Sequence, residues 1–469
     1  MKLDFYTGYL IYKDILFSFS FYNDELRLIP PNDKISEISR WGLKKIESGG
    51  YIPGDSILIE DEYLVGTSNE TGNLIVFFPT GHAVGKYNEV LRVRIRNFMI
   101  LNNDQNICGL AFYSEEIELI YPPNKTFNGY QSDKETGDIT VHTKKSHTSN
   151  DNIKFKHRDI EVCLTFYCER TIKMFGGKEP IAINSVLSLT FEETNDYSFI
   201  FGLYHIVEKL IMFMFNTKHI STQKCILKSA YDNSSNKSRE LISTSPYQYV
   251  IENEILDKKK CIRYDYLKTS FSKILQDISD GKIYLRHLPD NYEDSRAITP
   301  SRFVMIVAGF ENLFNLLYPN GVVHKNATMK KNEEFKERIN EFIEKGNLNS
   351  EMKRKFNRIV KELNRESVEA RLKHVYKFNK ELIDYFANLP FQLNHVEFEF
   401  EKVAENVQKY RNFFAHGGVF DDFDINALLG LALLEKINYI MQLKYYGLSD
   451  DLIKKSVNDL FHCCLMIND

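Results

Sequence analysis

Arg411 and His416 lie five positions apart, and they have the side-chain types that RNA cleavage requires. The ordinary pKa of an imidazole lies close to neutral pH, so a histidine can take up and release protons there. A guanidinium stays charged and can hold two phosphate oxygens at once. Such a pair can move the proton of a ribose 2′-hydroxyl and stabilise the charged phosphorane. The chemistry predicted is internal transesterification of RNA without a metal.

The segment 398–418 is expected to be a helix that presents these groups. Apolar residues recur along it at spacings of four, three and four, namely Val403, Val407, Tyr410 and Phe414. These residues form one stripe, which we expect to face the core. Asn412 and His416 lie four residues apart and almost opposite the stripe, and Arg411 lies at its margin. Three polar groups therefore point away from the core at the end of one helix.

The spacing alone is weak evidence, because an Arg followed by a His after four to six residues is expected about once by chance in a chain like this. Context strengthens it, since Asn412 lies between the pair, and Gly417 and Gly418 follow as helix C-terminal caps do. The alternative is that Arg411 and His416 only complement the negative end of the helix. One helix cannot easily supply both acid and base, so we expect two copies to face each other across a two-fold axis.

The run from Arg411 to His416, RNFFAH, resembles the R-x4-6-H motif of the HEPN superfamily of helical nucleases. The C-terminal part is similar to the ApeA-type HEPN proteins of bacterial anti-phage defence, over about residues 296 to 460. Ser301 to Phe314 resembles the family's helix with an acidic residue, and Ile437 to Ile453 resembles its closing helices. The β-rich N-terminal half resembles the domains that precede HEPN in such proteins.

This resemblance implies a bundle of four to five helices that dimerises through the motif helices. It implies metal-independent RNA cleavage that leaves a 2′,3′-cyclic phosphate and a 5′-hydroxyl, with host dormancy or death after infection is sensed. Arg411, Asn412 and His416 take the family's catalytic positions. Glu311 matches the acidic residue that steadies the catalytic Arg, although an ordinary ion pair of the bundle, with Arg302 or with a neighbouring helix, is the alternative. A second functional hypothesis is a catalytically idle HEPN module that binds RNA or protein as a scaffold.

Other classes of site find less support. Neither a G-x-x-x-x-G-K-[ST] nor a G-x-G-x-x-G pattern occurs, which argues against nucleotide hydrolases and kinases. Asp421, Asp422 and Asp424 are interpreted as a polar loop between helices. The seven cysteines contain no C-x-x-C pair, so we expect reduced thiols, with a zinc site from His219, Cys225 and Cys261 as the alternative. No cofactor and no metal are predicted.

The predicted fold class is α+β, with a β-rich half followed by an all-helical bundle. Residues 1–240 show strand-length runs between turn residues, with a break near 124–151; residues 241–295 are expected to be a helical connector and 296–469 the ribonuclease domain. The expected helices are Ser270–Asp280, Pro300–Tyr318, Glu333–Lys345, Ser350–Asn364, Glu366–Phe378, Lys380–Leu389, His395–His416, Ile425–Tyr446 and Ser449–Cys464.

Positive charge is concentrated locally, although the chain as a whole has a net charge of -4. The segment from Gly321 to Lys380 contains sixteen Lys and Arg and nine Glu. This excess of positive charge would suit binding of a folded RNA such as tRNA. The alternative is a pair of solvated helices with internal ion pairs. Within and beside this stretch, the predicted RNA contacts are Lys409, Arg371 and Lys373.

A strand with clean alternation is expected at Val90–Ile100. Arg92, Arg94 and Arg96 would line one of its faces. This face is either the solvent-exposed side of a half-buried strand or a surface that binds RNA, a protein trigger or a partner subunit.

The N-terminus, MKLDFYTGYLIYKD, has charges where a secretory signal needs an apolar run. The most apolar segments, 199–215 and 303–318, are shorter or more polar than the roughly 20 apolar residues of a membrane span. The predicted location is the cytoplasm, with RNA, a second copy of the chain and a phage protein trigger as partners.

Overall fold

The computed structural model describes most of the chain. The residues outside its description are 1–4, 40, 42, 46–50, 54–55, 60, 81–82, 88–89, 102–105, 134, 138, 145, 150, 173–180, 221–223, 230–238, 244–259, 291–293, 296–298, 323–325, 347, 363–365, 419–423, 464 and 466–469.

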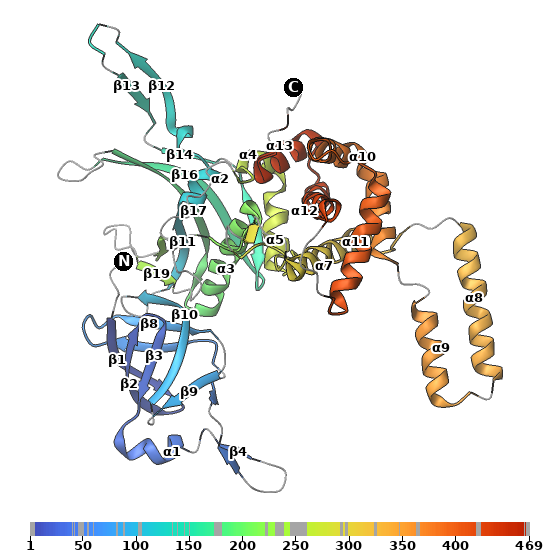
Figure 1. Cartoon of the computed structure of the whole chain (residues 1–469). Helices are drawn as coiled ribbons and strands as arrows, with labels where there is room; N and C mark the ends of the chain where they lie inside the picture. Colours follow the sequence, from blue (N-terminus) through green and yellow to red (C-terminus); the bar gives the residue numbers. More distant parts are fainter. Residues whose placement is uncertain are drawn as a thin grey trace. The chain divides into compact units, whose positions relative to one another are not determined.

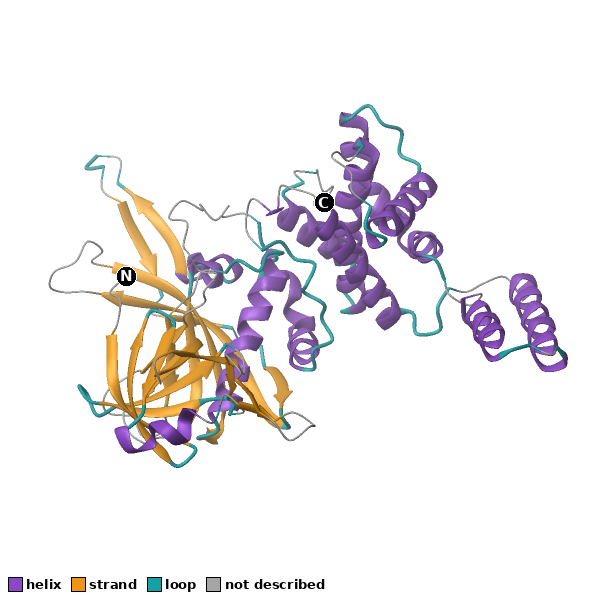
Figure 2. Ribbon diagram, turned by 60° about the horizontal axis from the view of Figure 1, so that its bottom comes forward, coloured by secondary structure: helices purple, strands orange, loops and turns teal. Residues whose placement is uncertain are grey.

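The chain forms two compact units. The first comprises Met1–Phe215 and His219–Lys282, and the second Asn216–Lys218 and Ile283–Asp469. Strands dominate the first unit and helices the second, so the predicted α+β class is confirmed (Figure 2).

A closed antiparallel barrel forms the beginning of the first unit (Figure 1). Its walls, in order around the barrel, are β10 (Val90–Leu101), β3 (Glu25–Ile29), β2 (Ile15–Tyr22), β1 (Phe5–Tyr12), β7 (Leu64–Ser68) and β8 (Leu74–Pro79), and β8 pairs with β10 to close it. Alternate residues fill the interior, including Phe17, Phe19, Phe21, Phe77, Val93 and Phe98. Alternation with a period of two is therefore what builds this core.

Strand β10 confirms the expected alternation, because Leu91, Val93 and Ile95 are fully buried and the three arginines between and beyond them point outward. Arg96 NH2 lies 3.9 Å from Glu208 Oε2 of α3 (Tyr197–Phe215). Smaller elements beside the barrel are α1 (Ile35–Ser39), β4 (Leu43–Lys45), β5 (Tyr51–Pro53), β6 (Ser56–Leu58) and β9 (Ala83–Tyr87).

The sheet continues from β10 into the rest of the first unit, in the order β10, β19, β18, β11, β17, β16 and β14. The bounds of these further strands are β11 (Ile107–Tyr113), β14 (Ser146–Thr148), β15 (Ile153–His157), β16 (Ile160–Ile172), β17 (Ile181–Thr194), β18 (Lys224–Lys228) and β19 (Arg239–Ser243), with the short helix α2 (Glu115–Ile120) after β11. The polar stretch 124–151 carries a separate two-stranded hairpin of β12 (Phe127–Ser132) and β13 (Ile139–Thr143).

Helix α3 is long and apolar enough to cross a membrane by length and composition, with a mean hydropathy of 1.5 over the most apolar window. Within the first unit, 61% of that window is buried, including Ile200, Leu203, Leu210 and Met214. Packing inside the unit therefore accounts for the apolar character of this helix.

Two short helices, α4 (Tyr264–Leu267) and α5 (Phe271–Ser279), lie in the segment expected to be a connector and belong to the first unit instead. The unit boundary falls at Lys282, between the two predicted boundaries. The apolar side of α5 is buried, and the side-chain oxygen of Gln276 accepts a hydrogen bond of 2.8 Å from the backbone N–H of Lys156 on β15.

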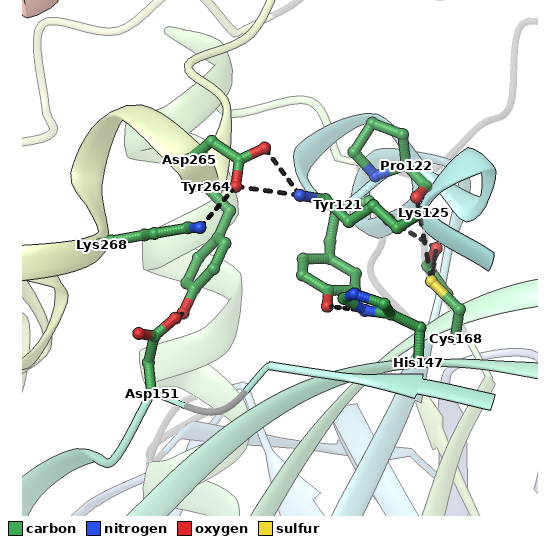
Figure 3. A network of polar contacts seen from close by, with 10 residues as sticks. Tyr121, Pro122, Lys125, His147, Asp151, Cys168, Tyr264, Asp265 and Lys268 are labelled. Atoms are coloured by element: carbon green, nitrogen blue, oxygen red, sulfur yellow. Dashed lines mark hydrogen bonds and ion pairs between the residues drawn. The ribbon is translucent and has the colours of Figure 1, made fainter. Parts of the chain in front are cut away.

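A polar network fastens α4 to the strands (Figure 3). Lys125 Nζ lies 2.9 and 2.7 Å from the two carboxylate oxygens of Asp265, and the Tyr264 hydroxyl donates to Asp151. Nearby, the Tyr121 hydroxyl and His147 Nδ1 are 2.7 Å apart. Desolvation lowers the pKa of His147, so its neutral form is favoured. The network therefore joins α4 to the segments that precede β12 and β15, through an ion pair and a hydrogen bond to a carboxylate.

The second unit is a helical bundle built around α12 (Ile425–Tyr445), which is apolar on all sides and packs against four other helices (Figure 1). The bounds of these helices are α7 (Pro300–Leu317), α10 (Val368–Leu393), α11 (Phe400–Ala415) and α13 (Asp450–Phe461). The side chains of Thr299, Ser367, Asp424 and Ser449 cap the N-termini of α7, α10, α12 and α13. A helix that is apolar all round is expected at the centre of a bundle. Helices α8 (Asn326–Lys345) and α9 (Ser350–Glu362) pack on each other as a hairpin.

Three helix predictions differ from the structure. The helix expected from Glu333 begins seven residues earlier, at Asn326. The expected helices Glu366–Phe378 and Lys380–Leu389 form one helix, α10, with a kink at Asn379, whose φ is -128° and ψ is 24°. The helix expected from His395 begins only at Phe400, because His395 takes a positive φ of 56° and the chain then runs extended. Phe398 packs on Phe391 in that extended segment, with ring centroids 5.0 Å apart, and this contact outweighs the helical pattern.

His287 provides a pH-dependent element of the second unit. It lies against Gly309 of α7, where an added Cβ would come within 3.1 Å of the imidazole. Desolvation by burial is the largest cause that lowers its pKa to about 4, and the nearby cations Lys218 and Arg302 act in the same direction. The native state therefore binds a proton less readily than the unfolded chain does.

We expect the free energy of unfolding of the second unit to fall as pH decreases through the window between the ordinary histidine pKa and about 4. The loss attributable to His287 should reach about 2 kcal/mol between pH 7 and pH 5. Thermal unfolding of the wild type and of His287→Asn, compared at several pH values, isolates this contribution. Parallel pH profiles of the two proteins would contradict the assignment.

Candidate active site

Helix α11 carries the Arg411 to His416 motif and buries the predicted stripe. Val403, Val407, Tyr410 and Phe414 are all buried. The ring of Phe303 on α7 contacts this stripe, with its centroid 6.1 Å from that of Tyr410 and 5.7 Å from that of Phe414. The apolar face of the motif helix is therefore fixed against α7, and its polar residues are left on the outer side.

The helix ends just before His416, which is its C-terminal cap with φ of -99° and ψ of 15°. The backbone N–H of His416 still bonds the carbonyl of Asn412 at 3.2 Å, so the two residues remain one turn apart. Gly417 takes a positive φ of 80°, which glycine adopts without strain, and Gly418 N–H bonds the carbonyl of Phe413 at 3.0 Å. This closure holds His416 at the exposed end of the helix.

Arg411 and Glu311 come together from two helices. Arg411 NH2 lies 3.5 Å from Glu311 Oε2 of α7, and the side chains are 27% and 26% exposed. Arg411 NH1 also donates to Asn412 Oδ1 at 3.3 Å. Arg302 does not compete for Glu311, since its NH2 lies 2.6 Å from Glu435 Oε1 of α12 in a largely buried pair. Glu311 therefore pairs with Arg411 and not with Arg302, and this geometry fits both a carboxylate that orients the guanidinium and an ordinary ion pair between helices.

Within the described part of the chain, the Arg411 guanidinium contacts these two side chains and does not bond the last carbonyls of α11. His416 is exposed, and no described residue forms a hydrogen bond or ion pair with its imidazole. The end of α11 thus carries a guanidinium held by two side chains and an exposed imidazole, the two kinds of group that phosphate chemistry uses.

The three predicted RNA contacts differ in their surroundings. Lys409 is exposed on α11, and its ammonium lies 5.9 Å from the ring centroid of Tyr410. Arg371 is mostly covered, with its guanidinium 5.1 Å above the ring of Phe314 and Nε 3.6 Å from a Glu366 oxygen.

Lys373 Nζ lies 2.7 Å from Glu369 and 3.8 Å from Glu405, and its hydrogen bond to Glu369 is the main cause that raises its pKa. Of the three side chains, Lys409 is therefore the one whose charge is not paired with a glutamate.

Sequence reasoning placed Tyr410 only in the core and missed its polar contact. The Tyr410 hydroxyl donates to Asp424 Oδ2 at 2.5 Å, and Asp424 Oδ1 accepts the N–H of Ala427 at 2.8 Å as the cap of α12. The hydrogen bond from Tyr410 is the main cause that lowers the pKa of Asp424. Asp424 therefore ties the motif helix to α12, which confirms its structural interpretation; Asp421 and Asp422 lie outside the described residues.

Metal ligation finds no support in the described ranges, where no three His, Cys, Asp or Glu side chains gather into a group that could hold an ion. Cys225 and Cys261 are buried, and burial raises the pKa of the Cys225 thiol. The six cysteines that the structure describes are all free thiols. Cys168 faces Ser185 Oγ and the carbonyl of Pro122, and its pKa is raised by burial, which disfavours a reactive thiolate.

No protein-family model, no curated protein and no solved structure matches the chain. The chemistry of Arg411, Asn412, His416 and Glu311 is therefore the basis on which a function can be inferred.

Proposed function

We propose that the chain is a metal-independent endoribonuclease of the HEPN type that acts in bacterial anti-phage defence. The observation that carries the proposal is the end of α11, where Glu311 and Asn412 contact the Arg411 guanidinium and His416 is exposed. The resemblance to the HEPN motif supports the same reaction class.

The reaction follows from the side chains. The His416 imidazole takes the proton of a ribose 2′-hydroxyl, and the 2′-oxygen then attacks the adjacent phosphorus. The Arg411 guanidinium holds the phosphate oxygens as negative charge grows on the phosphorane. The bond from phosphorus to the 5′-oxygen breaks, and that oxygen takes up a proton. The products are a 2′,3′-cyclic phosphate and a 5′-hydroxyl.

Base and acid roles are shared between two copies of the chain in this proposal. A single histidine can remove the first proton, but a second proton donor is needed at the leaving oxygen at the same time. A homodimer formed through the motif helices brings a second copy of His416 to the scissile bond. An isolated monomer is therefore expected to be inactive.

The proposed substrate is tRNA, cut in the cytoplasm when the N-terminal region is triggered by a phage protein. Lys409 is exposed on α11 and supplies positive charge on the motif helix. RNA is held at such a site by its phosphates and by unstacked loop bases.

The test uses purified wild type and His416→Ala, each incubated with total tRNA in the presence of a chelator, with and without phage lysate. Cleavage by the wild type alone supports the proposal. If the wild type never cuts under either condition while His416→Ala still protects cells from phage, the chain acts as a scaffold instead of a nuclease.

Glu311→Gln should lower the cleavage rate by about 10-fold, because a neutral amide no longer orients Arg411 and the transition state loses on the order of 1.4 kcal/mol. The effect should fall on kcat more than on KM, since Glu311 does not contact the RNA. Single-turnover kinetics measure it, with Glu381→Gln at an exposed position of α10 as the matched control that keeps the wild-type rate. An unchanged kcat in Glu311→Gln would show that the ion pair is only structural.

A further inference from the structure

The outer wall of the barrel carries a surface that the proposed cleavage site does not use. Strands β1, β2, β3 and the start of β10 lie side by side, and every second residue points away from the barrel core. Six large apolar side chains on this wall are 45% to 69% exposed, namely Phe5, Tyr9, Ile11, Leu16, Tyr22 and Ile29. Contiguous exposure of this kind marks a surface that binds something.

The strand register brings rings and guanidiniums into the same rows. Phe5 lies opposite Tyr22, and their ring centroids are 6.4 Å apart. Tyr22 lies opposite Glu25, and Glu25 lies opposite Arg94. One row across the wall therefore runs from two exposed aromatic rings to an exposed arginine.

The neighbouring row adds two more arginines, because Arg27 lies opposite Arg92. Arg27 Nε is 2.5 Å and Arg92 NH1 is 3.8 Å from the carboxylate of Glu25, with the two arginine side chains 53% and 42% exposed. Arg94 lies opposite the same glutamate in the strand register, so three outward-facing arginines and one glutamate stand together on these strands. The surplus of positive charge favours a polyanion over a second copy of the same surface.

We propose that this aromatic–arginine face, made of Phe5, Tyr9, Tyr22, Arg27, Arg92 and Arg94, binds single-stranded RNA. Bases stack on the exposed rings, and the guanidiniums hold phosphates along the strand. Thr7, Ser18 and Ser20 occupy positions between the rings on the same face, where hydroxyls can meet ribose 2′-hydroxyl groups. This binding does not depend on cleavage at His416.

The test measures binding by the full chain carrying His416→Ala, so that no substrate is consumed. The probe is a fluorescein-labelled oligouridine of about 15 nucleotides, a length that one barrel can contact. Tyr22→Ala should weaken binding about 5- to 100-fold, which is the loss expected for one stacked base. Replacing Arg92 and Arg94 together by Gln should reduce the slope of log affinity against log salt by about 1.4.

Matched controls lie elsewhere in the first unit. Tyr130→Ala, at a side chain 79% exposed on β12, and Lys154→Gln, at a side chain 46% exposed on β15, should leave the affinity unchanged. The proposal is overturned if the intact face does not bind the probe, if Tyr22→Ala binds as the parent does, or if single-stranded DNA of equal length binds equally well. Self-association of the chain that Tyr22→Ala abolishes would assign the face to a second copy. Binding without tRNA cleavage by the wild type would support this proposal and count against the nuclease.

Discussion

His416→Ala is expected to reduce RNA cleavage by a factor of 10² to 10⁴, the contribution of a positioned general acid or base. The loss should fall on kcat, because the imidazole acts on protons in the transition state and the exposed cap contributes little to substrate affinity. Single-turnover cleavage of labelled tRNA by wild type and variant measures it.

The fold should tolerate this substitution, since the His416 side chain is exposed and α11 is closed by backbone bonds to Gly417 and Gly418. Equal melting temperatures of the two proteins verify that point. His395→Asn is the matched control, because His395 is also exposed and also follows a helix, at a positive φ that Asn accepts. A His416→Ala protein that cuts at the wild-type rate would remove His416 from the mechanism.

Arg411→Lys has the second large expected effect, a decrease of about 10² in kcat. Lysine keeps the charge and can still pair with Glu311, but a single ammonium cannot hold two phosphate oxygens in the fixed geometry of a guanidinium. The comparison separates the hydrogen-bonding geometry of the residue from its charge, so a rate close to that of wild type would mean that charge alone is needed.

The measurement pairs Arg411→Lys with Arg286→Lys, a change at an exposed arginine of the same unit. The control should retain full activity and show that exchanging an arginine does not itself disturb the unit. Melting temperatures within error of the wild type for both variants make the rate comparison valid.

Local features were predictable from sequence because they depend on neighbours in the chain. The alternation of β10 and the apolar stripe of α11 follow from periodicity. Even the kink at Asn379 appeared as a gap between two expected helices.

Contacts between distant segments were not predictable in the same way. The Arg411 to Glu311 pair joins residues 100 positions apart, and nothing in its spacing favoured it over a pair with Arg302 until α7 and α11 were seen packed together. Closure of the barrel by β8 and β10 and the hydrogen bond from Tyr410 to Asp424 likewise arise from tertiary packing. The residues of the candidate site were therefore predictable from the sequence, and the contacts that hold Arg411 were visible only in the structure.

The ends of the RNA fragments test the central claim most directly. Wild-type protein incubated with tRNA and a chelator, under conditions in which it is triggered, should produce fragments with 2′,3′-cyclic phosphates and 5′-hydroxyls, because the attacking oxygen belongs to the substrate's own ribose. His416→Ala should produce none. Fragments with 5′-phosphates, or cleavage that the chelator abolishes, would contradict a metal-independent transesterification by Arg411 and His416.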